Sequence, residues 1–455
     1  MVGKKSKATV ADVSKKSRKK GKGKKIDWYD EFVDRKHKPK KKDVVALFHY
    51  EGERGMPAKE VLGRIASESS VGTWTTMPRM PKNLKKLKAI VYKWNKDTAY
   101  IDYPLELWEK RSIPQLLSGI AGNIMGMKAV KNLRLIDATL PREWIRDFKG
   151  PVYGKEAIRR IFKRRKGPIT STVIKPKLGF THKEHAELSY EIWTGGIDCI
   201  KDDENLTNQS FNQFKQRVRL MAKRRDKAEK ETGDVKDAFI NITSGDLKTM
   251  AERIKYVHDH GFRYFMIDVV LAGFPAVMTA SELAHDYKMA IHGHRAMHAM
   301  FTRNRRHGMT MLFLAKLARL AGVDQIHTGT VIGKLEGDKK EILAMKDMLL
   351  SKKVGEVKGI RMAQDWGKIK STMPVSSGGL HPGILAYMFN IYKTSDMVIQ
   401  VGGGTLGHPK GAHAGAKAVV QAVEAYHKGI PVDVYAKKHK ELAEALAKWG
   451  HIRPV

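Results

Sequence analysis

The sequence predicts an α/β protein, namely a (β/α)8 TIM barrel preceded by a small α+β domain. After Tyr153, short apolar stretches alternate with amphipathic stretches of helix length, a pattern typical of repeated strand–helix units. Charged residues or glycines follow these apolar stretches, as at the end of a barrel where catalytic side chains gather. The eight predicted barrel strands are Thr172–Ile174, Ile197–Ile200, Ala238–Ile242, Tyr264–Val270, Ala290–His292, Gln325–Thr328, Met373–Val375 and Met397–Val401.

Four regions follow from this pattern. Residues 1–25 are a basic tail with almost nothing to bury, which predicts disorder. Residues 26–150 form the α+β domain, 151–430 the barrel, and 431–455 a helical appendage. The α+β domain has predicted strands at Val44–Phe48 and Ala89–Tyr92, and predicted helices at Pro57–Ala66 and from Pro114. Other predicted helices are Lys183–Thr194, Leu247–His260, Lys339–Ser351 and Val432–Trp449.

Composition narrows the class of protein. The chain has 455 residues, 42% of them hydrophobic, which suits a globular protein with a sizeable core. No apolar run approaches the roughly 20 residues of a membrane span, and no signal peptide follows the basic N-terminus. The single cysteine, Cys199, excludes an intrachain disulfide framework and leads us to expect a cytoplasmic protein. We interpret Cys199 as a packing residue of a buried strand.

The net charge of +37 predicts attraction to polyanions, either phosphorylated metabolites or nucleic acid. The basic tail is interpreted either as a loose nucleic-acid contact or as a solubilising extension. A nucleic-acid-binding protein with a vestigial barrel is the alternative from another functional class. Its binding would weaken steeply with salt.

The segment Gly195–Asn205 carries the strongest chemical signal. Asp203 and Glu204, at the end of a short buried strand, offer the hard oxygen ligands that Mg²⁺ prefers. Lys201 is out of place among such ligands unless CO₂ converts it to an anionic carbamate, which requires a depressed pKa. The alternative is a Lys–Asp/Glu ion-pair cluster on a solvated turn.

Other strand ends carry groups that suit acid–base chemistry and phosphate binding. Lys175 and Lys177 flank a proline, and adjacent positive charge lowers a lysine's pKa toward that of a usable acid; a surface basic turn is the alternative. His294 suits proton transfer and Arg295 suits a phosphate, although histidines in such runs are often structural. With His327, Arg295 forms a predicted phosphate pole.

Glycine-rich segments follow the last three strands. Residues 327–337 (HTGTVIGKLEG) suggest a mobile lid that carries Lys334 over a substrate. Residues 376–379 (SSGG) and 402–405 (GGGT) follow the last two strands, where this fold builds phosphate sites from backbone N–H groups. Two phosphate poles predict a bisphosphate substrate.

Taken together, these strings resemble the large subunit of ribulose-1,5-bisphosphate carboxylase/oxygenase (Rubisco), from about Val44 to about Ala425. The most specific strings are GGIDCIKDDEN, TVIKPKLGF, HRAMHAMF, HTGTVIGKLEG, SSGGLHPG and VGGGTLGHP, joined by ESSVGTWTT and GNIMGMKAVKNLRL near the N-terminus.

The resemblance implies a role for each matching residue. Lys201, as a carbamate formed from a non-substrate CO₂, would hold Mg²⁺ with Asp203 and Glu204. The carbamate would remove the C3 proton, Lys175 would protonate the final carbanion with Lys177 tuning it, and His294 would assist hydration. Lys334 would reach CO₂ from the closed lid. The remaining matches are Glu68 and Asn123, which would complete the site from another subunit, Thr73, Trp74, Gly379, Gly402 and Gly403 at one phosphate, and Arg295, His327 and Ser377 at the other.

The resemblance also implies an activity and an assembly. Ribulose 1,5-bisphosphate, CO₂ and water would give two 3-phosphoglycerates, with O₂ as a competing gas. The helix sequences are most similar to the archaeal form III branch, which implies a homodimer or larger homo-oligomer without small subunits and a role in AMP ribose salvage. The alternative hypothesis is a Rubisco-like enolase or isomerase that acts on another sugar phosphate. The basic N-terminal extension and the absence of a latching tail after Val432 depart from the family pattern.

Overall fold

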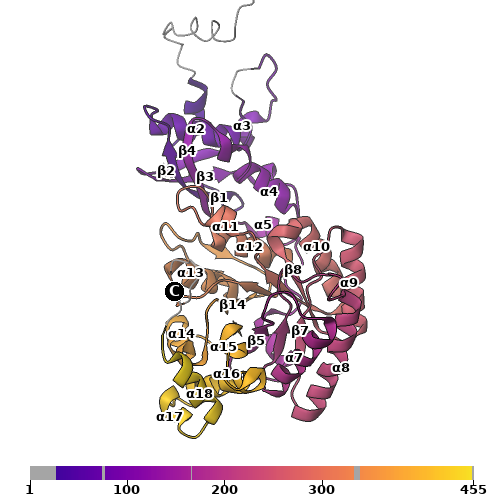
Figure 1. The fold of residues 1–455 in the computed structure, drawn as a ribbon. Coiled ribbons are helices and arrows are strands. Elements are labelled where there is room, and N and C mark those ends of the chain that lie inside the picture. Colours follow the sequence, from indigo (N-terminus) through magenta and orange to yellow (C-terminus); the bar gives the residue numbers. More distant parts are fainter. Residues whose placement is uncertain (1–26, 74–76, 165, 333–338, 453–455) are drawn as a thin grey trace, which may run out of the picture.

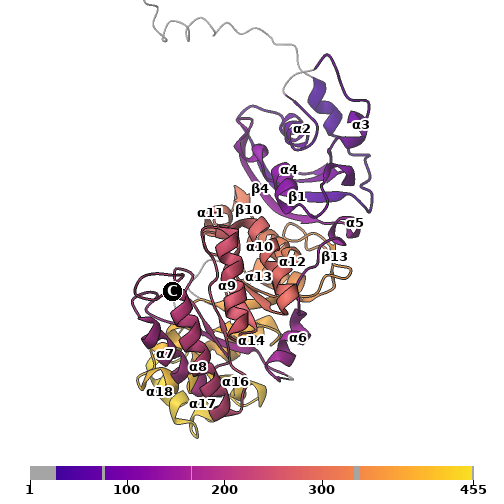
Figure 2. The same cartoon turned by 90° about the vertical axis from the view of Figure 1, so that its right-hand side faces the viewer.

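The computed structural model describes residues 27–73, 77–164, 166–332 and 339–452, which form an elongated molecule with a five-stranded sheet, an eight-stranded sheet and a two-stranded hairpin (Figures 1 and 2). The predicted basic tail, Trp74 and the lid residue Lys334 lie outside the described residues. Within the described residues, no helix has the length and apolar content that crossing a membrane requires.

The N-terminal sheet has five strands in the order β10-β4-β1-β3-β2. Its antiparallel strands are β1 (Val44–Gly52), β2 (Ile90–Trp94), β3 (Thr98–Tyr103) and β4 (Val130–Thr139). The fifth, β10 (Gly308–Met309), comes from the barrel sequence and pairs in parallel with Arg134 and Leu135 of β4. The sheet is therefore completed by residues more than 150 positions away in the chain, which the sequence did not predict. Short helices accompany it: α2 (Ala58–Glu68), α3 (Leu84–Leu87), α4 (Ile113–Ile120), α5 (Arg142–Ile145), and the 3₁₀ turns Asp27–Phe32, Leu105–Leu107 and Asn123–Gly126.

The second sheet is the predicted eight-stranded parallel barrel. Its strands are β5 (Ile169–Val173), β6 (Cys199–Lys201), β7 (Asp237–Phe239), β8 (Tyr264–Asp268), β9 (Ala290–His294), β11 (Gln325–His327), β14 (Met373–Ser377) and β15 (Val398–Gln400). They pair in the order β7-β6-β5-β15-β14-β11-β9-β8. Hydrogen bonds from Met266 N to Ile240 O (2.7 Å) and from Ile242 N to Met266 O (2.9 Å) close the ring between β8 and the residues that follow β7.

Helices surround this barrel, as the alternating pattern predicted (Figure 1). Each crossover returns the chain to the same edge of the sheet, so all strand ends that carry the predicted site residues face one way. The helices are α6 (Gly154–Ile161), α7 (His182–Thr194), α8 (Phe214–Thr232), α9 (Leu247–Asp259), α10 (Val269–Tyr287), α11 (Ala299–Thr302), α12 (Met311–Ala321), α13 (Lys339–Leu350), α14 (Leu385–Tyr392), α15 (Gly403–Leu406), α16 (Gly411–His427), α17 (Val432–Ala436) and α18 (Lys440–Trp449). A 3₁₀ turn, Pro382–Ile384, and the hairpin strands β12 (Lys353–Val354) and β13 (Gln364–Asp365) complete the list.

One local prediction is wrong at a strand end, and another, for Cys199, is confirmed. The strand predicted to run to Val270 stops at Asp268, and Val269 begins α10. The β-branched run favours strand, but packing of this segment as a helix overrides that weak preference. Cys199 is fully buried in a cluster with Phe239, Tyr264 and Met266, which confirms its role in packing.

Buried polar contacts join the N-terminal sheet to the barrel helices. Lys316 of α12 lies 2.6 Å from Asp137 of β4, with both side chains fully buried, and its Nζ also donates to Ala138 O at 2.7 Å. The Arg134 guanidinium donates to the backbone carbonyls of Thr302 and Asn304. The two sheets are thus held together by specific contacts as well as by apolar packing.

Candidate functional site

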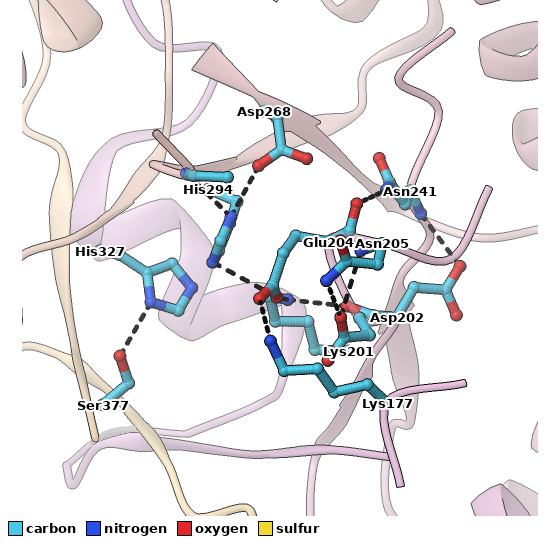
Figure 3. Close-up of polar contacts among 12 residues, drawn as sticks. Lys177, Lys201, Asp202, Glu204, Asn205, Asn241, Asp268, His294, His327 and Ser377 are labelled. Atoms are coloured by element: carbon cyan, nitrogen blue, oxygen red, sulfur yellow. Dashed lines mark hydrogen bonds and ion pairs between the residues drawn. The ribbon is translucent and has the colours of Figure 1, made fainter. Parts of the chain in front are cut away.

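The polar residues at the ends of β5, β6 and β9 converge on one cluster (Figure 3). Lys175 Nζ donates to Asp203 Oδ2 at 2.7 Å, and Lys177 Nζ donates to Glu204 Oε1 at 3.4 Å. Lys201 Nζ lies 3.4 Å from Glu204 Oε2 and donates to the Asp202 carbonyl at 2.7 Å. Three lysines thus face two carboxylates that are adjacent in sequence.

Burial sets the electrostatics of Lys201. Its side chain is 1% exposed, and loss of hydration lowers the pKa of its amine, although the surrounding carboxylates oppose that shift. Burial acts in the opposite sense on Glu204, but Lys201 and His294 outweigh it and lower the pKa of Glu204 to about 2. The cluster therefore combines an ionised carboxylate with a lysine that loses its proton more readily than an exposed lysine does.

His294, at the end of β9, is held between two acidic groups. Its Nδ1 lies 2.6 Å from Asp268 Oδ1, and its Nε2 lies 3.5 Å from Glu204 Oε2 (Figure 3). Burial and the nearby Lys201 lower the pKa of His294, against the pull of Asp268. The ring is therefore oriented by Asp268 and presents Nε2 toward the carboxylates.

Asp202 braces the loop that carries the carboxylates. Its Oδ2 accepts from Arg217 Nε at 3.2 Å and from Asn241 N at 3.1 Å, and Arg217 is fully buried. Asn205 donates from its backbone and side-chain nitrogens to Asp203 Oδ1 at 3.1 and 3.0 Å. The loop that carries Asp203 and Glu204 is thus held by Arg217 of α8, by Asn241 after β7 and by Asn205 of the loop itself.

The predicted phosphate pole lies beside this cluster. The His294 and His327 rings are 4.9 Å apart, and His327 Nδ1 is 2.9 Å from Ser377 Oγ. Arg295 is 8% exposed, and burial lowers the pKa of its guanidinium to about 10. A cavity of about 770 Å³ opens next to Arg295, lined also by the basic residues Arg134, Arg303, Arg305 and Lys340. This side of the barrel mouth is suited to anions.

The second predicted phosphate pole is built from backbone. Gly402 precedes α15 and lies against the end of β5, where a Cβ would approach Val173 Cγ1 to 3.0 Å. Gly379 has a φ of +75°, a left-handed conformation that side chains rarely adopt. Gly402 and Gly403, which follow β15, and Gly379, which follows β14, therefore lie at neighbouring strand ends without side chains.

The chain matches two family descriptions over most of its length. Residues 154–449 match "Ribulose bisphosphate carboxylase large chain, catalytic domain", and residues 31–144 match its N-terminal domain. The chain belongs to the Rubisco large-chain family. A ribulose bisphosphate carboxylase of Pyrococcus abyssi is 46% identical over 434 residues, covering 94% of this chain and 99% of that relative. One of Archaeoglobus fulgidus is 45% identical over 437 residues, with shares of 94% and 99%.

Solved Rubisco structures share the fold. The dimeric archaeal Rubisco from Hyperthermus butylicus has a TM-score of 0.89 at 45% identity and covers 93% of this chain and 100% of its own. The octameric Rubisco from Pyrococcus horikoshii, in complex with sulfate ion, has a TM-score of 0.88 at 46% identity, with shares of 94% and 98%. The predicted fold class and family resemblance are confirmed.

Three predicted site residues lie away from this Rubisco-family cluster. Glu68 is the last residue of α2, and Asn123 opens a 3₁₀ turn beside it. Helix α2 lies at the end of the molecule away from the barrel (Figures 1 and 2). Thr73 follows α2 and is half-buried there. The single chain therefore does not bring these residues to its own barrel.

The sequence analysis also missed residues that support the site. Asp268 orients His294, and Asp202 with Arg217 braces the carboxylate loop. Asp268 ends the observed strand β8 but lies inside the strand predicted to reach Val270, so the rule that flagged Lys201 could have found it only with the correct strand end. Arg217 carried no such signal, because its role depends on α8 packing beneath the loop.

Proposed function

We propose that this chain is a ribulose-bisphosphate carboxylase that adds CO₂ and water to ribulose 1,5-bisphosphate and yields two 3-phosphoglycerates. The observation that carries the proposal is the buried Lys201 beside Asp203 and Glu204, with Lys175 and His294 reaching the same carboxylates. The relatives from Pyrococcus and Archaeoglobus carry the carboxylase name.

The donor set fits Mg²⁺ on one condition. Asp203 and Glu204 supply hard oxygen ligands. In this structure the ammonium groups of Lys175 and Lys177 pair with the two carboxylates and balance the negative charge that a metal cation would otherwise balance. Among the residues described, no cluster of three or more His, Cys, Asp or Glu side chains is arranged to hold a metal. The third protein ligand would therefore be Lys201 as a carbamate, which forms when its neutral amine adds CO₂. When bound, the metal would polarise the substrate carbonyl and stabilise negative charge that develops on it.

The chain's own groups then divide the proton transfers. The modified Lys201 takes the C3 proton, which leads to the enediolate that reacts with CO₂. His294, oriented by Asp268 and close to Glu204, assists the addition of water at C3. Lys175, half-exposed at the barrel mouth, donates a proton to the final carbanion, while Lys177 tunes it. Lys334 would bring a cation to CO₂ from the lid, and we expect Lys334→Ala to enolise substrate without carboxylating it.

A second copy of the chain completes the site in this proposal. Glu68 and Asn123 lie too far from their own barrel to reach its cluster, so we assign them, with Thr73 and Trp74, to the barrel of a partner. The relatives of known structure are dimeric and octameric. We propose a homodimer or an oligomer of dimers without small subunits.

The metabolic setting is an extension of the same proposal. We infer an oxygenase side reaction, because the enediolate is open to either gas, and a role of the archaeal form III type in AMP ribose salvage. The relatives above are archaeal enzymes at 45–46% identity.

The deciding experiment is incorporation of labelled CO₂ into acid-stable product. The protein is preincubated anaerobically with bicarbonate and Mg²⁺, and ribulose 1,5-bisphosphate is then added. Label in 3-phosphoglycerate that depends on both additions supports the proposal. No label in folded protein would contradict it and favour the Rubisco-like enolase or isomerase.

A further inference from the structure

A line of four hydrogen bonds runs from the barrel core to the proposed phosphate pole. Gln325 Nε2 lies 3.2 Å from Tyr264 Oη, and Gln325 Oε1 lies 3.0 Å from His292 Nδ1. His292 Nε2 lies 2.9 Å from His327 Nε2, and His327 Nδ1 lies 2.9 Å from Ser377 Oγ. Tyr264, Gln325 and His292 are fully buried, whereas Ser377 is partly exposed at the barrel mouth. The line therefore connects a dry interior to a surface where substrate would bind.

The two imidazoles are neutral. Burial lowers the pKa of His292 and of His327 far below the ordinary value, and the neighbouring His294, Lys201 and Arg295 lower that of His327 further. Phe239 stacks on His292 with centroids 4.1 Å apart and planes 8° apart, which fixes the ring plane. Each ring therefore carries one proton, on either Nδ1 or Nε2.

The contact between the Nε2 atoms of His292 and His327 means that the protonated nitrogen of one ring determines the protonated nitrogen of the other. Two neutral rings can share that contact only if one nitrogen is a donor and the other an acceptor. If Gln325 Oε1 accepts from His292 Nδ1–H, then His327 Nε2–H must donate to His292. His327 Nδ1 is then an acceptor, and the Ser377 hydroxyl donates to it. We call this arrangement, in which the hydrogen bonds are donated toward the barrel core, the inward direction.

The opposite direction uses the same atoms. The oxygen and nitrogen of an amide have the same shape, so the Gln325 side chain can turn without moving its neighbours. Tyr264 O–H then donates to Gln325 Oε1, and the amide donates to His292 Nδ1. His292 Nε2–H donates to His327, and His327 Nδ1–H donates to Ser377. We call this arrangement, in which the hydrogen bonds are donated toward Ser377, the outward direction. Both directions contain four hydrogen bonds and one proton on each imidazole.

Only the outward direction suits an anion at Ser377. There the hydroxyl hydrogen is free to donate to a phosphate oxygen, whereas in the inward direction Ser377 presents lone pairs to a negative charge. The outward direction also gives the buried Tyr264 hydroxyl hydrogen an acceptor in Gln325. Burial raises the pKa of Tyr264, so this hydrogen is retained.

We propose that Tyr264, Gln325 and His292 are positioning residues that set the hydrogen-bond direction of the phosphate pole outward when a bisphosphate binds. The inference rests on the proposed function, because it assumes that Ser377 and His327 meet a substrate phosphate. It adds three residues that touch no substrate and act through His327.

Steady-state kinetics with ribulose 1,5-bisphosphate test the role of the buried end. Tyr264→Phe removes the donor that favours the outward direction, and we expect KM to rise about threefold with kcat nearly unchanged. Gln325→Met removes the directing amide and should raise KM about tenfold. The matched control is Tyr153→Phe, which deletes a hydroxyl bonded to Lys288 O beside the same core cluster and should leave KM unchanged. Equal KM values for all three variants and the wild type would overturn the proposal.

Nitrogen NMR of the unmodified protein reads the direction itself. With ¹⁵N-labelled histidine, protonated and lone-pair ring nitrogens are well separated, and His292→Gln and His327→Gln assign the signals. With ribulose 1,5-bisphosphate bound in the presence of a chelator, we expect protons on His292 Nε2 and His327 Nδ1. Protons on His292 Nδ1 and His327 Nε2 would reject the proposal, whatever the variants do.

The wild type separates this inference from the proposed function. If the wild type neither turns over nor binds ribulose 1,5-bisphosphate, the proposed function fails. If it does both while the tautomers lie in the inward direction, the function stands and the directing role of Gln325 fails.

Discussion

The barrel and the N-terminal sheet differ in how they use buried charge. In the barrel, Lys201, Asp203 and Glu204 come from one strand end and meet Lys175 and His294 from neighbouring strands. In the N-terminal sheet, the fully buried charge, Asp137, is paired with Lys316 of the barrel and accepts two backbone N–H groups. The barrel thus concentrates charge where a ligand can reach it, whereas the sheet uses charge to fix its position.

The buried charges of the barrel therefore suit catalysis, whereas the buried charge of the N-terminal sheet holds the sheet and the barrel together. The barrel can be tested through residues within one chain, whereas our proposal assigns Glu68 and Asn123 of the N-terminal region to the site of another chain.

Loss of Lys201 should have the largest effect. Lys201→Met removes the proposed carbamate and with it a proposed metal ligand, and we expect the carboxylation rate to fall by a factor on the order of 10³ or more. Lys236→Met is the matched control, since Lys236 is another fully buried lysine whose pKa burial lowers, but it precedes β7 at the opposite end of the barrel. Comparable losses in both variants would show that burial of a lysine, rather than its place at the strand end, matters.

The activity lost in Glu68→Gln should be partly restored by a second chain that lacks Lys201 but keeps Glu68. Glu68→Gln should reduce turnover by about 10²-fold or more, because the charge it brings to the partner's site is absent. Co-assembly of equal amounts of Glu68→Gln and Lys201→Met chains should restore roughly a quarter of wild-type activity, since half the dimers are mixed and each holds one intact site. Mixed dimers, isolated by two affinity tags, without activity would contradict the shared site.

Breaking the buried pair between sheet and barrel should cost stability rather than chemistry. Lys316→Met leaves Asp137 buried without its cation, and we expect the free energy of unfolding in denaturant to fall by about 3–5 kcal/mol. Burial already raises the pKa of Asp137 in the folded state. The folded variant therefore binds a proton more readily than the unfolded chain, so its deficit should shrink as the pH falls toward the ordinary Asp range. A deficit independent of pH would mean that lost packing, not the unpaired carboxylate, is responsible.

The exposed pair at the same boundary should matter least. Arg306 and Asn132 hydrogen-bond Glu51 of β1 and lower its pKa from 4.5 to about 2. A lowered folded pKa means that the stabilisation is present above pH 4.5 and is lost as the pH falls toward 2. Arg306→Ala should therefore cause only a small loss of stability near neutral pH, reduced further by salt. A loss as large as that of Lys316→Met would remove the distinction between buried and exposed contacts.

The barrel, the family and the local chemistry of the strand ends were predictable from the amino-acid sequence alone. The spacing of Lys201, Asp203 and Glu204 places all three at one strand end, because consecutive residues leave a strand together however the strand is packed. The same local logic placed His294 at the end of β9 and glycines after β14 and β15. It was wrong where the strand predicted to reach Val270 stops at Asp268, since propensity is weaker than packing.

Which distant groups meet depends on long-range packing. Pairing of β10 with β4, the Lys316–Asp137 contact, and the His292–His327 contact each join segments 35 or more positions apart. Their partners are selected by barrel closure and by the seating of α12 against the sheet, and local spacing carries no information on either. The same reason explains why Glu68 lies far from its own barrel although its sequence resembles a site residue. Local sequence pattern specifies which side chains lie at a strand end, and long-range packing specifies which distant residues those side chains contact.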